Sequence, residues 1–210
     1  MNQKYKMVVF DMDGVIVDIE SSWIYVHKTF NVDSKINYEE YLMGKIDYKE
    51  FMKKDIQLWG LCHIDKIKKI FENIPLINGV EYTIQELRRR GYKLALLSAG
   101  ISLLADKLNK ELNFDYVLAN ILCTDSNGYL TGEGIPVVEL LLKKSAFKKL
   151  IKEARVKPKE CVAIGDSRFD IPIFKNVGLS IAFNTNDISV KKAANKIIKI
   201  KDLKEILKFL

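Results

Sequence analysis

The sequence is poor in the residues that mark disulfide-linked, fibrous or zinc-binding proteins. Among 210 residues it has 3 cysteines, 2 histidines, 4 prolines and 11 glycines. Cys62, Cys123 and Cys161 are far apart and form no CxxC pair, which favours reduced thiols, and neither histidine stands at a zinc-site spacing from them. No apolar run could span a membrane, and residues 1–6 lack the apolar core of a signal peptide. We therefore expect a cytoplasmic protein without disulfides or a membrane segment.

The composition predicts one folded domain, with or without an insertion. Hydrophobic residues make up 48% of the chain and charged residues 29%, and this length suits one domain. The formal net charge is +7, from 34 Lys and Arg against 27 Asp and Glu. Because the lysines are spread over helical segments and arginine is scarce, we expect no nucleic-acid partner. Either a monomer or a homodimer is compatible with the sequence.

Short apolar runs alternate with helical patterns along most of the chain. Such alternation is typical of an α/β fold, a Rossmann-like parallel sheet with helices on both faces. The predicted strands are Met7–Phe10, Lys93–Leu97, Tyr116–Leu118, Cys161–Ile164, Leu179–Phe183 and Ile197–Ile200. The predicted helices are 80–90, 102–111, 138–154, 169–177, 188–194 and 202–209.

Two segments interrupt this alternation. Residues 121–133 contain Asn127-Gly128 between apolar pairs, a hairpin signal. Residues 18–75 are rich in aromatic residues and helical patterns and have no clear strand. We therefore predict a small helical cap domain at 18–75, inserted after the first strand of a core domain formed by 1–17 and 76–210.

Paired carboxylates follow the first predicted strand, in Asp11-Met12-Asp13-Gly14. Residues i and i+2 of an extended chain point the same way, and ligands of parallel sheets bind at the carboxyl ends of strands. Two carboxylates crowded there repel unless a cation lies between them or one is protonated. By itself the motif is equally compatible with a polar turn that ends a strand.

Two further positions could bind an anion. Ser98 ends the next buried strand, before a helix predicted to open at Ile101, where a hydroxyl and backbone N–H groups can bind a phosphate; an ordinary N-cap serine is the alternative. Lys144, in a run of apolar and basic residues, could supply a fixed positive charge, although a solvated lysine is the usual role.

A second pair of acids follows the strand at 161–164. Asp166 ends that strand and Asp170 comes four residues later, at a predicted helix start where it could also be an N-cap. Four acids, Asp11, Asp13, Asp166 and Asp170, are thereby expected at one edge of the sheet. An oxygen-rich donor set without nitrogen or sulfur suits Mg²⁺.

The order DxDG, Ser98, Lys144 and Gly165-Asp166-Ser167-Arg168-Phe169-Asp170 resembles the haloacid dehalogenase-like superfamily of phosphotransferases, across essentially the whole chain. The chain looks closest to its phosphoserine phosphatase branch. Other matches to that branch are Glu20, Gly79, the Asn120–Gly132 region and Lys201-Asp202-Leu203.

The resemblance implies a Mg²⁺-dependent phosphomonoester hydrolase acting on a small phosphorylated metabolite through an aspartyl-phosphate. Asp11 would be the nucleophile and Asp13 the general acid and base. Mg²⁺ would bind the Asp11 and Asp166 carboxylates and the backbone carbonyl of Asp13, with Asp170 beside the metal shell or orienting Lys144. Ser98, Ala99 and Lys144, chosen over Lys143 for its spacing to Asp166, would hold the phosphoryl oxygens.

Some positions depart from the branch. The cap arginine that holds the substrate carboxylate there corresponds to Asp55, which would repel a carboxylate; Lys53 or Lys54 could substitute, without the bidentate fork of arginine. Glu20 matches the acid that receives the substrate ammonium group. We therefore expect Glu20 and Asp55 to set specificity, for a cationic or hydroxyl-rich phosphate. Ala99 and Phe169 stand where the branch usually has glycine and asparagine.

Other functions remain open within and beyond this fold. A dehalogenase would not need an acid at Asp13, because halide leaves unprotonated. A phosphomutase shares the DxDGV string and would return the phosphoryl group to a bound sugar phosphate. A non-catalytic binding module would show no Mg²⁺-dependent turnover of any phosphate ester.

Overall fold

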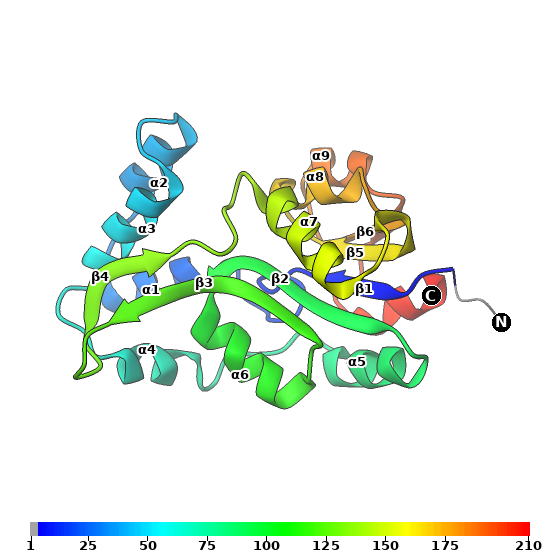
Figure 1. The fold of residues 1–210 in the computed structure, drawn as a ribbon, viewed down its shortest axis with the longest axis horizontal. Coiled ribbons are helices and arrows are strands. Elements are labelled where there is room, and N and C mark those ends of the chain that lie inside the picture. The colour runs from blue at the N-terminus through cyan, green and yellow to red at the C-terminus, as the bar shows by residue number, and fades with distance from the viewer. Residues whose placement is uncertain (1–3) are drawn as a thin grey trace.

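The computed structural model describes residues 4–210. Residues 1–3 lie outside the described residues; they belong to the segment considered for a signal peptide and to the predicted core domain. The described chain forms a seven-stranded sheet in the order β4-β3-β2-β1-β5-β6-β7 (Figure 1). All neighbouring strands are parallel except β3 and β4, which form an antiparallel hairpin. The strands are β1 Met7–Phe10, β2 Lys93–Ile101, β3 Tyr116–Thr124, β4 Leu130–Ile135, β5 Cys161–Gly165, β6 Leu179–Phe183 and β7 Lys196–Ile198.

Helices cover both faces of the sheet, on opposite sides in Figure 1. They are α5 Val80–Arg89, α6 Ser102–Leu112 and the 3₁₀ helix η3 Leu203–Phe209 on one face, and α7 Lys143–Ala154, α8 Ile171–Phe174 and α9 Ile188–Ala193 on the other. Two short 3₁₀ helices, η1 Pro158–Glu160 and η2 Arg168–Asp170, flank β5.

The central strand β1 shows why the sheet needs both layers. All four of its residues are buried. Val8 and Phe10 belong to the apolar core with α5 and α6, whereas Met7 and Val9 belong to the core with α7 and α8, as the two-residue period of a strand requires. The strand therefore holds its carboxyl end, and the acids that follow, in the middle of the sheet edge.

The segment after β1 forms four helices and no strand among its described residues: α1 Ser22–Phe30, α2 Lys35–Leu42, α3 Tyr48–Gln57 and α4 Ile64–Phe71. The two connecting chains lie side by side, with a bridge between Val17 and Leu76 and a 2.8 Å hydrogen bond from Asp18 N to the Pro75 carbonyl. Helix α3 packs against β4. The division into a core and a cap domain, with boundaries at 18 and 75, stays a prediction.

Some elements differ from the sequence-based prediction. The helix expected over 138–154 begins only at Lys143, and the one expected over 169–177 is the short pair η2 and α8. Strand β2 continues through Ile101 and α6 begins at Ser102, so Ser98 lies within the strand and is no N-cap. The cysteines are free. None of the helices among residues 4–210 is long and apolar enough to cross a bilayer.

Candidate active site

Asp11 leaves β1 at the centre of the sheet edge. Its Oδ1 accepts a 2.8 Å hydrogen bond from the Met12 backbone N–H, and its Oδ2 lies 2.7 Å from Lys143 Nζ. Burial raises the pKa of Asp11 above its ordinary value, while the charge of Lys143 acts in the opposite direction. The carboxylate is thus fixed at both oxygens by groups from two different elements.

Asp13 is oriented by a serine that the sequence analysis did not single out. The backbone N–H and the hydroxyl of Ser22 donate to Asp13 Oδ2 at 2.9 and 3.0 Å, and Ser22 is fully buried. Asp13 Oδ1 is buried without a partner. Burial raises the pKa of Asp13 to about 6, against the opposing hydrogen bonds from Ser22. A carboxyl group with this environment can hold a proton and release it near neutral pH.

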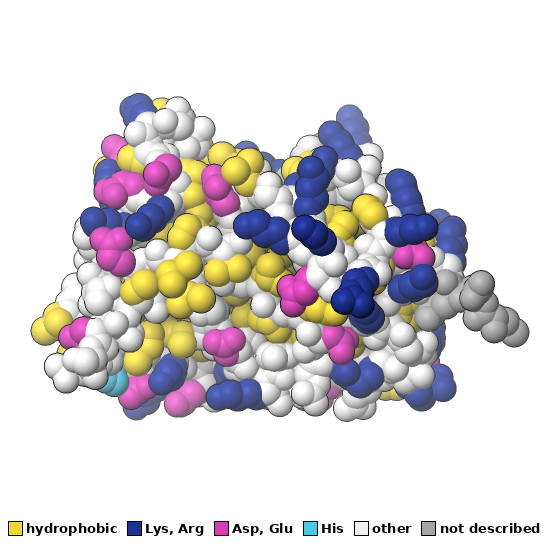
Figure 2. All heavy atoms as spheres, viewed as in Figure 1, with side chains coloured by type: hydrophobic (Ala, Val, Ile, Leu, Met, Phe, Trp, Pro, Cys, Tyr) yellow, Lys and Arg dark blue, Asp and Glu magenta, His cyan; other side chains and the backbone are white. Residues whose placement is uncertain are grey.

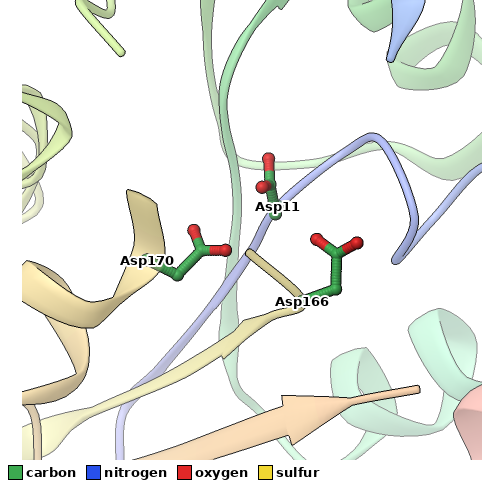
Figure 3. Close-up of side chains that lie close together, drawn as sticks. All are labelled: Asp11, Asp166 and Asp170. Carbon is green, nitrogen blue, oxygen red and sulfur yellow. The ribbon is translucent and has the colours of Figure 1, made fainter. Parts of the chain in front are cut away.

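Asp166 and Asp170 complete the acidic group at the same edge, from the end of β5 and from η2. Carboxylate oxygens of Asp11, Asp166 and Asp170 all lie within 4.8 Å of one another, and Figure 3 shows the side chains converging on one space. Asp170 Oδ2 accepts from the Ser167 N–H and hydroxyl at 3.1 and 3.0 Å. Within residues 4–210, no donor is paired with Asp166, and burial followed by the charge of Asp11 raises its pKa.

Glycine is required where the first loop meets Asp166. Gly14 has a φ of +75°, and a Cβ built there would collide with the Asp166 carboxylate. A side chain at position 14 would therefore strain the backbone and would also displace the carboxylate of Asp166.

The lysine of the site is Lys143, which corrects the prediction of Lys144. Lys143 Nζ lies 2.7 Å from both Asp11 Oδ2 and Asp170 Oδ1, and the residue is 3% exposed. Burial opposes its charge, but the two carboxylates outweigh burial and raise its pKa. Lys144 is half-buried and lies outside the cavity lining. Helix α7 begins at Lys143, so only this first residue faces the acids.

Ser98 and Ala99 line the same cavity from the carboxyl-terminal part of β2. Ser98 is buried, and its hydroxyl accepts a 3.0 Å hydrogen bond from the Gly100 N–H. The Ala99 carbonyl accepts from Trp23 Nε1, Tyr48 Oη and Asn120 Nδ2 at 3.0, 3.3 and 2.7 Å. The insertion and β3 therefore hold this part of β2 in place.

One cavity joins these residues to the inserted helices. Its volume is about 740 Å³, and it is lined by Asp11, Asp13, Ser98, Lys143 and Asp166 at one end and by helices α1–α3 at the other. The predicted specificity residues both line it. Glu20 is 71% exposed at its side chain and lies 3.6 Å from Lys28, whereas Asp55 is buried.

The donor set fits a hard divalent cation. Asp11, Asp166 and Asp170 all offer carboxylate oxygens, but Asp170 already accepts three hydrogen bonds, from Lys143 and from the N–H and hydroxyl of Ser167, whereas Asp11 accepts two and Asp166 has no donor within residues 4–210. Oxygen donors without nitrogen or sulfur suit Mg²⁺. Asp170 is therefore better placed to hold Lys143 than to bind the ion.

We predict that the metal-free protein loses stability as the pH rises. Asp11, Asp13 and Asp166 all have pKa values above those of an unfolded chain, with Asp13 at about 6. Above about pH 4 these acids have lost their protons in the unfolded state but still hold them in the folded state. The free energy of unfolding therefore falls as the pH rises from about 4 through the pKa values of the folded protein. Thermal unfolding in chelator at about pH 5 and about pH 8 measures this, with the lower midpoint expected at the higher pH. An equal or higher midpoint at about pH 8 contradicts the prediction.

Comparison with known proteins gives consistent matches. A family model described as haloacid dehalogenase-like hydrolase matches residues 5–178. A phosphoserine phosphatase of Methanocaldococcus jannaschii is 32% identical, covering 100% of both chains, and one of Lactococcus lactis is 29% identical, covering 97% of this chain and 94% of its own. A solved structure of a phospho-aspartyl intermediate analogue of phosphoserine phosphatase has a TM-score of 0.83 at 31% identity and covers 99% of each chain. A substrate-bound phosphoserine phosphatase structure has a TM-score of 0.83 at 31% identity over 100% of each chain.

Proposed function

The chain belongs to the haloacid dehalogenase-like hydrolase family, and from this membership and the site geometry we propose that it is a Mg²⁺-dependent phosphomonoester hydrolase acting on a small organic phosphate. The observation that carries the proposal is the arrangement around Asp11: a carboxylate held by Lys143, with Asp166 beside it, at one end of a cavity. The relatives named above are phosphoserine phosphatases.

In the first proposed step, Asp11 attacks phosphorus. A bond forms between its carboxylate oxygen and phosphorus as the bond from phosphorus to the ester oxygen breaks, and Asp13 gives its proton to the leaving alcohol. In the second step Asp13, now a carboxylate, takes a proton from water as that water attacks the aspartyl-phosphate. Asp11 is freed and inorganic phosphate leaves. The pKa of Asp13, about 6, suits a group that must both give and take a proton.

The charges of the site favour this transfer. Asp11, Asp166 and the backbone carbonyl of Asp13 would hold Mg²⁺, whose positive charge would offset the repulsion between the attacking carboxylate and the phosphate. Lys143, Ser98 and the backbone of Ala99 would hold the remaining phosphoryl oxygens as charge shifts in the transition state. Asp170 would keep Lys143 in place through their 2.7 Å contact.

The surface and the cysteines support a small-metabolite enzyme of the cytoplasm. Figure 2 shows basic and acidic side chains interspersed on this face, with hydrophobic side chains between them, unlike the continuous basic stripe of a nucleic-acid binder. The three free cysteines suit a reducing compartment. We propose a monomer or homodimer that needs no nucleic acid or membrane.

Removal of the metal is expected to abolish turnover. In a panel of phosphorylated metabolites that includes phosphoserine and a hexose 1-phosphate, phosphate release should fall to background with EDTA and return with excess Mg²⁺. Asp166→Asn should require much more Mg²⁺ for the same rate, because it removes a carboxylate ligand. Asp65→Asn, an exposed aspartate of α4 outside the cavity lining, is the matched control.

Full turnover in EDTA would refute metal dependence, and no turnover of any ester would refute the proposed function. Recovery of the phosphoryl group on a second sugar hydroxyl, instead of as inorganic phosphate, would identify a phosphomutase.

A further inference from the structure

The part of the cavity that is lined by the inserted helices carries a buried carboxylate. Asp55 of α3 is 2% exposed and lines the cavity. Its Oδ2 lies 3.1 Å from His27 Nε2 of α1, and its Oδ1 accepts a 2.9 Å hydrogen bond from Asn37 Nδ2 of α2. Three helices of the insertion thus converge on one anionic group.

The hydrogen bonds assign the charge of this group. Trp59 Nε1 lies 2.9 Å from His27 Nδ1. An indole N–H can only donate, so Nδ1 must accept and carries no proton. The proton of His27 is then on Nε2, where it donates to Asp55, and the imidazole is neutral. Asn37 is neutral as well, so the hydrogen bonds hold Asp55 as a carboxylate without cancelling its charge.

Within residues 4–210, the two lysines adjacent to Asp55 in sequence are paired with other acids and do not cancel its charge. Lys53 and Lys54, adjacent in sequence, pair with Glu133 at 2.9 Å and Glu40 at 2.6 Å. A carboxylate oxygen has more than one lone pair, so each Asp55 oxygen can accept a further donor from the cavity. A buried charge left in this state is costly unless a ligand of opposite charge compensates it.

The rest of the lining suits a cation and not an anion. Aromatic side chains of Trp23, Tyr38, Tyr48 and Phe51 line the same cavity, and aromatic faces attract ammonium groups.

The described lining contains no arginine, and its lysines are Lys28, Lys35 and Lys143. Lys28 and Lys35 are exposed and lie near Glu20 and Glu39, at 3.6 and 3.9 Å, while Lys143 belongs to the acidic site. A substrate carboxylate would therefore meet no buried cation among the lining residues of the inserted helices.

We propose that Asp55 receives a substrate ammonium group, so that the preferred substrate is the phosphomonoester of a small amino alcohol without a carboxylate. This inference rests on the proposed phosphatase function and adds its substrate class. The phosphate would lie at the Asp11 end of the cavity and the ammonium group at the Asp55 end. A neutral alkyl phosphate would lack the ionic contact, and phosphoserine would bring its carboxylate towards Asp55.

The test compares three esters on the full-length enzyme with Mg²⁺: 2-aminoethyl phosphate, n-propyl phosphate of nearly the same size, and phosphoserine. We expect kcat/KM for 2-aminoethyl phosphate to exceed that for n-propyl phosphate by about 10- to 100-fold, the value of a hydrogen bond to a charged group. Phosphoserine should be slower than 2-aminoethyl phosphate by about 10-fold or more. This comparison needs no variant.

The variant Asp55→Asn tests whether Asp55 causes the preference for 2-aminoethyl phosphate. The ratio of kcat/KM for 2-aminoethyl over n-propyl phosphate should fall to within about threefold of unity, while n-propyl phosphate turnover persists. Asp33→Asn is the matched control, because Asp33 also lines the cavity but is exposed, and it should leave the ratio unchanged.

The possible failures are distinguishable. Equal rates for the amino and the neutral ester, or fastest turnover of phosphoserine, would overturn the inference and leave the phosphatase function standing. Loss of the preference in Glu20→Gln but not in Asp55→Asn would overturn the assignment to Asp55. No Mg²⁺-dependent turnover of any of the three esters or of the wider metabolite panel would overturn the proposed function itself, and the inference with it.

Discussion

Replacing Asp11 by asparagine is expected to lower kcat by about 10⁵-fold, the scale at which loss of a nucleophile acts in other enzymes. Asparagine has nearly the same shape and can still accept the Met12 N–H at the position of Oδ1. Its amide cannot attack phosphorus as a carboxylate does, and it removes the charge that pairs with Lys143 at 2.7 Å. Steady-state phosphate release at saturating Mg²⁺ measures the change.

The intermediate gives a second, independent readout of Asp11. Acid quenching during turnover followed by peptide mass analysis should find the phosphoryl group on the peptide containing Asp11 in the wild type and on no peptide in Asp11→Asn. Thermal unfolding of both proteins controls for folding. A variant that retains a tenth of the wild-type kcat, or a phosphorylated peptide from elsewhere in the chain, would exclude Asp11 as the nucleophile.

The parts of the fold that could be predicted are those where local pattern and burial agree. The four apolar residues of β1 predict a strand buried on both faces, and the structure buries all four. The acids after β1 and β5 follow from the same logic, because parallel strands bring their carboxyl ends to one edge. Asp11 accordingly lies beside Asp166 and Asp170 although it is far from both in sequence.

The choice between Lys143 and Lys144 could not be made from the sequence because it depends on helical phase. Successive residues of an α-helix are rotated by about 100°, so neighbouring lysines face different directions. The prediction of a helix from 138 placed neither lysine at its start, whereas α7 begins at Lys143. The residue at which the preceding loop ends and α7 begins therefore sets this phase and decides which ammonium group reaches the acids.

Ser22 and Asn120 were missed for a different reason. Each makes its important contacts with residues distant in sequence: Ser22 with Asp13 and with the Ile101 N–H, and Asn120 with the Ala99 carbonyl and the Val138 N–H. A single serine or asparagine carries no periodic signal. Only the folded arrangement shows that Ser22 positions Asp13 and that Asn120 positions the part of β2 that lines the cavity.

Replacing Lys143 by methionine is expected to lower kcat/KM by about 10²- to 10³-fold, the cost of losing one preorganised group that stabilises developing charge. Methionine keeps most of the length and apolar stem of lysine but removes the ammonium that lies 2.7 Å from both Asp11 and Asp170. With that buried cation gone, the acids repel one another more strongly. The midpoint of thermal unfolding without metal should therefore fall more at about pH 8, where the acids are ionised, than at about pH 5.

Lys144→Met is the matched control: it makes the same change one position along α7, outside the cavity lining, and should leave kcat/KM within about twofold of wild type. The reverse result, with activity lost in Lys144→Met and kept in Lys143→Met, would mean that the ammonium seen between Asp11 and Asp170 does not act on the phosphate.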